Sequence, residues 1–156
     1  MNIGIIVWSA TGHSLSVAER IAETLTGAGH TASIERIAID GDPVQRNPEF
    51  TLTRIPPVSG FDALILASPV EAFSLSPVMD RYLSAAGPLS GKRVYCLVTQ
   101  YFPRAWMGGN RAAGQMKGLV EAGGGIAAGT AVINWSSKRR EDQICAACAA
   151  AKRIFS

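Results

Sequence analysis

Six residues near the start of the chain combine hydroxyl groups, a glycine and a histidine in a pattern that suits anion binding. They follow an apolar run at residues 3–8 and lead into an amphipathic segment. A strand that enters a helix through such a loop leaves backbone N–H groups without intrahelical partners, where the helix dipole is positive. The sequence therefore predicts a site for a phosphate monoester. The residues of this loop are Ser9, Ala10, Thr11, Gly12, His13 and Ser14.

The same loop has a simpler interpretation, because Ser and Thr are also preferred helix caps and need no ligand there. His13 likewise has two possible roles. Its imidazole is either a solvated group at the helix start or a phosphate contact that strengthens on protonation. We expect the backbone N–H of His13 to make the contact and treat its side chain as optional.

Composition indicates a globular chain. Its 156 residues are 47% hydrophobic and 17% charged, which is enough apolar material for one domain with a sizeable core. No apolar run approaches the roughly 20 residues that a membrane helix needs. The N-terminus lacks the basic segment of a secretory signal. We therefore expect one domain over residues 1–156, located in the cytoplasm and not in a membrane.

Charge and cysteine content narrow the function classes further. The net charge is +3, and the one dense basic run is Lys138–Arg140. Such a run is typical of a solvated face or a helix start, and without interleaved aromatics it is poor evidence for nucleic-acid binding. An odd, sparse set of cysteines fits a reducing compartment. Cys145 and Cys148 have the spacing of a redox motif but lie in an Ala-rich helical stretch with Cys96 far away, so we expect helix packing and no metal site.

Hydrophobic periodicity predicts five strands that alternate with helices. The strands are expected at residues 2–8, 31–37, 61–67, 93–99 and 126–135. The helices are expected at residues 14–26, from Pro77 onward with Ser76 as its cap, at 111–122 and at 137–155. The Pro-rich segment 40–59 leaves no room for a full helix, so we expect an irregular second crossover. Right-handed crossovers then give an α/β domain whose parallel sheet is covered on both faces.

Ligands of such sheets bind beyond the C-terminal ends of the strands. Three polar or aromatic loops leave those ends, at residues 9–14, 68–76 and 99–110. Their aromatic side chains are Phe73, Tyr101, Phe102 and Trp106. These rings offer faces on which a flat ligand can stack, although core packing or a partner surface would use the same residue types.

The chain resembles the flavodoxin family in these three loops. A strand leads into Ser9–Ser14, a buried strand ends at Ser68–Val70, and another ends at Thr99–Tyr101. Their order and spacing extend the resemblance over essentially the whole chain. Short-chain flavodoxins are three-layer α/β sandwiches with a five-stranded parallel sheet in the order 2-1-3-4-5, and they bind flavin mononucleotide (FMN). The resemblance implies the same fold and cofactor here.

The resemblance also implies which residues contact FMN. The loop at residues 9–14 would wrap the phosphate, with Ala10 contributing only its backbone. The second loop would border the flavin ring and the third would close its other edge. The second loop supplies Ser68, Pro69, Val70, Glu71, Ala72 and Phe73. The third supplies Thr99, Gln100, Tyr101 and Phe102.

Three features depart from that family. Its electron carriers are usually strongly acidic, whereas this chain is mildly basic and has Arg104 in the loop expected near the ring. A cation there would raise the reduction potential of the flavin. The family often uses a flexible glycine beside the ring, but Glu71–Ser74 contains none, so a peptide flip would cost more. The loop at residues 99–110 is long and apolar, which suits a lid or a substrate wall.

Three functions from different classes remain open. The leading one is an FMN-binding protein that carries electrons between partner proteins. The second is an NAD(P)H-dependent reductase of a quinone, a flavin or another small aromatic substrate. The third is a flavin-free interaction module, against which the complete phosphate loop argues. The absence of a GxGxxG motif favours the carrier modestly. No side chain is an obvious general acid or base, so we assign no catalytic residue.

Overall fold

Five apolar segments form the parallel strands of one sheet in the computed structural model, which describes residues 1–43 and 49–156. They are β1 (Asn2–Val7), β2 (Thr31–Arg36), β5 (Ala63–Glu71), β7 (Arg93–Gln100) and β8 (Ile126–Asn134). Their spatial order is β2-β1-β5-β7-β8. Numbered along the chain, these parallel strands have the expected order 2-1-3-4-5. The central strands β1 and β5 are almost wholly apolar because both faces of the sheet are covered.

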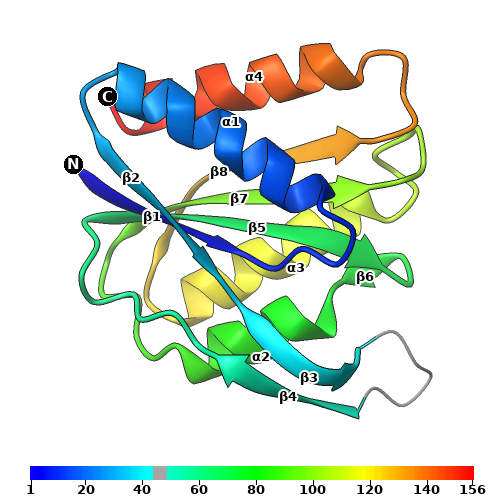
Figure 1. Cartoon of the computed structure of the whole chain (residues 1–156), viewed down its shortest axis with the longest axis horizontal. Helices are drawn as coiled ribbons and strands as arrows, with labels where there is room; N and C mark the ends of the chain where they lie inside the picture. Colours follow the sequence, from blue (N-terminus) through cyan, green and yellow to red (C-terminus); the bar gives the residue numbers. More distant parts are fainter. Residues whose placement is uncertain (44–48) are drawn as a thin grey trace.

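Four helices of the described ranges cover the sheet, two on each face (Figure 1). The helices α1 (His13–Gly27) and α4 (Arg140–Ile154) pack on one face, and α2 (Pro77–Ala85) and α3 (Gly109–Ala122) pack on the other. Successive strand residues point to opposite faces. Ile5 therefore enters the core under α1 and α4, whereas Ile6 enters the core under α2 and α3. These layers form the three-layer sandwich that the resemblance implied.

The start of α2 agrees with the sequence pattern. The Ser76 hydroxyl accepts a hydrogen bond from the N–H of Val78 at 3.2 Å, and Pro77 is the first helical residue. Proline suits that position because its missing N–H would have no intrahelical partner. The predicted cap is therefore confirmed.

The second crossover differs from the expectation. Residues 40–59 were expected to be irregular, but β3 (Ala38–Asp42) and β4 (Glu49–Arg54) form an antiparallel hairpin. Part of the expected irregular segment, residues 44–48, lies outside the described residues. Phe50 and Leu52 alternate with polar residues and pack toward the core under α2. Pro56 follows the hairpin and so does not interrupt the pairing.

The expected loop at residues 68–76 is also shorter than predicted. Strand β5 continues through Glu71, and β6 (Ser74–Leu75) turns back to pair with it. Only Ala72 and Phe73 form the turn. Pro69 lies within the sheet and pairs opposite Thr99 near the end of the strand. Proline is tolerated there when its missing N–H falls at a position that does not need a donor.

Tyr82 joins α2 to the end of the hairpin crossover. Its side chain is fully buried, and its hydroxyl donates a hydrogen bond to the carbonyl oxygen of Pro56 at 2.6 Å. Burial raises the pKa of the Tyr82 phenol well above its usual range. The phenol therefore stays protonated and remains a donor at every physiological pH.

We expect Tyr82→Phe to lower the free energy of unfolding by about 1–2 kcal/mol, because it removes the buried donor that Pro56 accepts. Urea denaturation followed by circular dichroism measures the change. Tyr101→Phe is the control, since Tyr101 is 70% exposed and its hydroxyl has no partner in the described part of the chain. An unchanged unfolding midpoint for Tyr82→Phe would contradict the assignment.

Candidate functional site

The hydroxyl of Ser9 holds the loop between β1 and α1 in its conformation through two hydrogen bonds. The Ser9 Oγ accepts hydrogen bonds from the N–H groups of Gly12 at 3.1 Å and of Leu15 at 3.3 Å. Gly12 has a φ of 92°, a left-handed conformation that favours glycine. It occupies the N-cap position of α1, where no side chain caps the helix. The first turn of α1 is thus left open toward solvent.

Four backbone N–H groups among residues 10–14 have no acceptor anywhere in residues 1–43 and 49–156. They belong to Ala10, Thr11, His13 and Ser14. Ala10, Thr11 and Gly12 are exposed, so a ligand can reach the loop. Several free N–H donors at the positive end of a 15-residue helix match the charge and the acceptor oxygens of a phosphate. The donor set therefore fits a phosphate monoester.

A buried hydroxyl pair joins this loop to the end of β7. Ser14 is 1% exposed, and its Oγ lies 2.9 Å from Oγ1 of Thr99. The Ser14 hydroxyl therefore faces the sheet, and only its N–H is left for a ligand. Among the hydroxyls of the predicted phosphate loop, that of Thr11 is exposed and makes no contact with the described residues.

The turn between β5 and β6 holds two non-glycine residues at positive φ. Ala72 has a φ of 50° and Phe73 a φ of 61°. Two-residue hairpin turns favour this conformation, but it costs a non-glycine residue roughly 1–2 kcal/mol. Gly108 packs against the turn so closely that an added Cβ would lie 2.9 Å from the Cα of Phe73. The sequence suggested that positive φ is disfavoured here, yet the fold imposes it on both residues.

Glu71 lies beside this turn and is held from two sides. One carboxylate oxygen accepts a hydrogen bond from Nε1 of Trp8 at 3.3 Å, and the other accepts one from Oγ of Ser76 at 2.9 Å. These bonds link the end of β1 to the start of α2. Ser68 is fully buried and donates to the carbonyl of Pro69 at 3.0 Å. Ser68 and Glu71 thus support the predicted site from within.

Three aromatic rings from two loops gather at this edge of the sheet. The rings of Phe73 and Phe102 stack with centroids 5.3 Å apart and an interplanar angle of 9°. Tyr101 meets Phe102 edge-on at 6.3 Å. Phe73, Phe102 and Tyr101 are 55%, 38% and 70% exposed, so they present apolar area to solvent. Trp106 is also exposed but contacts none of these rings. Such exposed rings are suited to stacking a flat ligand.

Gln100 fastens the loop that follows β7. Its Nε2 donates to the carbonyl of Arg104 and to Oδ1 of Asn134, each at 2.6 Å. The side chain is buried, and its Oε1 has no donor within the described residues. Gln100 was predicted to contact the ligand, and the structure shows that its amide holds the loop in place.

A fourth loop, which follows β8, also reaches the site and was missed in the sequence. The N–H of Trp135 donates to the carbonyl of Gln100 at 2.7 Å. The indole stacks on the imidazole of His13, with centroids 3.9 Å apart and an interplanar angle of 10°. The guanidinium of Arg140 lies over the same indole at 4.6 Å. The available signal was the tryptophan at the end of the expected fifth strand, followed by the basic run that was expected to be a solvated face or a helix start.

The surroundings of His13 disfavour the charged form of its imidazole. Desolvation by burial, and then the positive charge of Arg140, hold the pKa of His13 below its ordinary value of 6.5. Both effects disfavour the charged imidazolium. An anion bound nearby would act in the opposite direction and raise the pKa of His13.

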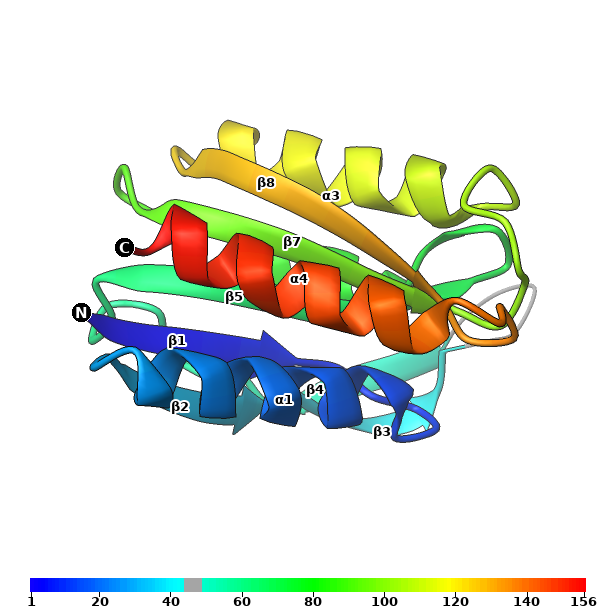
Figure 2. The same cartoon turned by 90° about the horizontal axis from the view of Figure 1, so that it is seen from above.

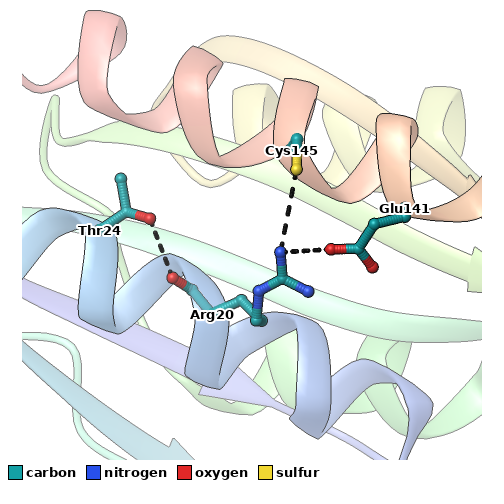
Figure 3. Close-up of polar contacts among 4 residues, drawn as sticks. All are labelled: Arg20, Thr24, Glu141 and Cys145. Carbon is teal, nitrogen blue, oxygen red and sulfur yellow. Dashed lines mark hydrogen bonds and ion pairs between the residues drawn. The ribbon is translucent and has the colours of Figure 1, made fainter.

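Cys145 and Cys148 lie on α4, and only Cys148 packs in the core as expected. Cys148 is buried between α1 and α4, and burial raises the pKa of its thiol. Cys145 is exposed, with its Sγ 3.9 Å from the guanidinium of Arg20, which also pairs with Glu141 at 2.6 Å (Figure 3). Within the described ranges, no three His, Cys, Asp or Glu residues are placed to hold a metal. No described helix is long and apolar enough to cross a membrane.

The fold matches solved structures over nearly its whole length. A two-electron reduced flavodoxin from Megasphaera elsdenii superposes with a TM-score of 0.70 at 19% identity, covering 97% of this chain and 98% of that one. The chain has a flavodoxin-like fold. The predicted fold class is therefore confirmed.

Two other flavodoxin-like neighbours bear on function. A flavoprotein in complex with FMN from Lactobacillus acidophilus NCFM has a TM-score of 0.58 at 13% identity, covering 91% of this chain and 97% of that one. A proposed quinone reductase from Klebsiella pneumoniae has a TM-score of 0.61 at 16% identity, covering 99% of this chain and 83% of that one. No protein-family model and no curated protein matches this sequence. At these identities the likeness is one of fold.

We expect Ala72→Gly to raise the free energy of unfolding by about 1 kcal/mol, because glycine adopts a positive φ without steric strain. Urea denaturation measures the gain. Ala86→Gly serves as the control, since Ala86 has a φ of −72° and glycine there relieves no positive φ, so this substitution should lower the free energy of unfolding. Equal effects of the two substitutions would show that the turn is unstrained.

Proposed function

We propose that this protein binds FMN and carries electrons between partner proteins in the cytoplasm. The observation that carries the proposal is the set of four unsatisfied N–H groups at the start of α1, on the sheet edge where three exposed aromatic rings gather. FMN joins a phosphate dianion to a flat ring, so it needs both features. The flavin supplies the redox chemistry when bound, and the chain supplies binding, orientation and electrostatics.

Each loop has a distinct role in this proposal. The backbone of residues 10–14 binds the phosphate, and the hydroxyl of Thr11 adds one exposed donor. The turn at Ala72 and Phe73 borders the flavin ring, and Tyr101 and Phe102 close its other edge. Thr99, Gln100 and the second-loop residues before the turn keep these groups in place by internal hydrogen bonds.

The charge near the site favours a reduced flavin. Arg104 is exposed in the loop after β7, whose position Gln100 fixes through the Arg104 carbonyl. A cation beside the ring stabilises the extra negative charge that reduction brings. The reduction potential of bound FMN is therefore expected to lie above that of strongly acidic carriers of the same fold.

We expect apoprotein to quench FMN fluorescence at micromolar concentrations, and Gly12→Asp to weaken this binding at least about tenfold. An aspartate at the N-cap competes for the free N–H groups and repels the phosphate, and the backbone strain that it adds at positive φ is reproduced in the control. Fluorescence titration measures both affinities.

Gly29→Asp provides the matched control for this titration. Gly29 has nearly the same φ as Gly12, 93° against 92°, has open space around it and lies beyond the opposite end of α1. The control adds the same charge far from the phosphate loop and should leave affinity unchanged. The absence of quenching by the wild-type protein would exclude FMN binding and favour the flavin-free module.

The second candidate is an NAD(P)H-dependent reductase of a quinone, a flavin or another small aromatic substrate. The exposed pair of Phe73 and Phe102 supports it, because two stacked rings on separate loops can part to admit a flat molecule. The carrier is favoured because the chain has no dinucleotide fingerprint.

Steady-state assays with purified holoprotein separate the two candidates. For a carrier, we expect NAD(P)H oxidation with a quinone acceptor to stay at the background rate until a separate NAD(P)H-dependent flavoprotein reductase is added. Rapid oxidation by the holoprotein alone would overturn the carrier assignment and establish the reductase.

A further inference from the structure

The cluster of His13, Trp135 and Arg140 is not explained by packing of the two helices alone. It brings together two side chains that can carry positive charge, His13 at the start of α1 and Arg140 at the start of α4. We propose that these three residues form a cationic clamp for the phosphate group of the bound nucleotide, with Arg140 as its permanent charge. This inference rests on the proposed function, and it adds to the phosphate contact the side chain of His13 together with two residues from outside the loop at residues 9–14, Trp135 and Arg140.

The clamp is built around a fixed indole. The N–H of Trp135 donates to Gln100 at 2.7 Å, and the following N–H, of Ser136, donates to Tyr101 at 3.0 Å. These two bonds tie the loop after β8 to the loop after β7. Arg140 donates from Nη1 to the carbonyl of Trp135 at 2.8 Å while its guanidinium lies over the ring. The position of Arg140 is therefore set before any ligand arrives.

His13 connects the indole to the free N–H groups. It is the first residue of α1, and its own N–H is one of the four donors without an acceptor in the described chain. Its ring is parallel to the indole at 3.9 Å, so the imidazole is fixed beside the first turn of the helix. A phosphate bound to that turn would lie next to the imidazole and within the field of Arg140.

The charge of Arg140 remains available for an anion. Within the described residues it forms no ion pair. The neighbouring carboxylate, Glu141, is already paired with Arg20 at 2.6 Å, as Figure 3 shows. Arg139, next in sequence, faces Asp142 at 3.7 Å instead. Arg140 is thus the residue of the basic run whose charge is both held in place and left without a counter-ion.

The clamp also predicts a proton uptake on binding. Arg140 is the charged group that lowers the pKa of His13, together with burial against Trp135. A phosphate dianion bound at the first turn of α1 screens Arg140 and attracts the imidazolium, so the pKa of His13 rises. Affinity for FMN should then increase as the pH falls from about 8 toward the ordinary histidine pKa of about 6.5.

The first test compares FMN with riboflavin, which has the same ring but no phosphate, by fluorescence titration. We expect Arg140→Gln to weaken FMN binding about tenfold and to leave riboflavin binding unchanged, because a charge-assisted contact to phosphate is lost. Arg139→Gln makes the same change in net charge one residue away and should stay close to wild type. Arg140→Lys keeps the charge and should recover most of the FMN affinity.

The second test uses proton NMR, because the chain contains only two histidines. His30 lies 3.1 Å from the N-terminal amine of Met1, at the opposite end of α1, and is an internal reference. We expect the pKa of His13 to rise on adding FMN or inorganic phosphate to a phosphate-free sample, whereas the ring resonances of His30 should not respond to the ligand. In Arg140→Gln without ligand, the pKa of His13 should already be higher than in wild type.

The outcomes distinguish the clamp from the proposed function. If FMN is not bound but inorganic phosphate raises the pKa of His13, the clamp stands as an anion site and the flavin proposal fails. If FMN is bound but Arg140→Gln behaves like Arg139→Gln, the clamp is wrong while the flavin proposal stands. Equal weakening of FMN and riboflavin would show that Arg140 merely supports Trp135, and would also overturn the clamp.

Discussion

Parallel pairing forces all the main strands to end at one edge of the sheet, and the candidate site depends on this constraint. Loops that are far apart in the sequence must meet where β1, β5, β7 and β8 end (Figure 2). Each loop brings something different: free N–H groups after β1, a strained turn after β5, exposed rings after β7 and a cationic cluster after β8. None of these features would act on one ligand without the shared edge.

Direct bonds between the loops make this edge a defined surface. The hydroxyl pair of Ser14 and Thr99 joins the first loop to the third, and the N–H of Trp135 joins the fourth to the third. Gly108 lets the third loop press against the turn at Phe73. The polar side chains of Ser14 and Gln100 form hydrogen bonds within the protein and are therefore not directed at a ligand. The ligand is left mainly with backbone donors and ring faces, which keep their geometry because the loops restrain one another.

Electrostatics distinguish this chain from an acidic carrier of the same fold. Burial and a neighbouring guanidinium keep His13 neutral when no anion is present. The helix dipole of α1 and Arg140 act in the same direction, so both favour an anion at one place. A group that gains its charge only with the ligand adds attraction without a permanent desolvation cost.

The sequence alone determined the alternation of strands and helices along the chain, because apolar periodicity reports burial, whereas the spatial order of the strands was expected only from the resemblance to flavodoxins. It also located the loop at residues 9–14, because a hydroxyl-rich turn between a strand and a helix is a local pattern. It did not reveal the hairpin at β3 and β4, since prolines around short alternating strands resemble a loop. The positive φ of Ala72 and Phe73 depends on strand pairing, and the stack of His13 on Trp135 joins residues 122 positions apart. Only tertiary structure decided these features, because they arise from contacts between segments whose separation in the chain carries no local signal.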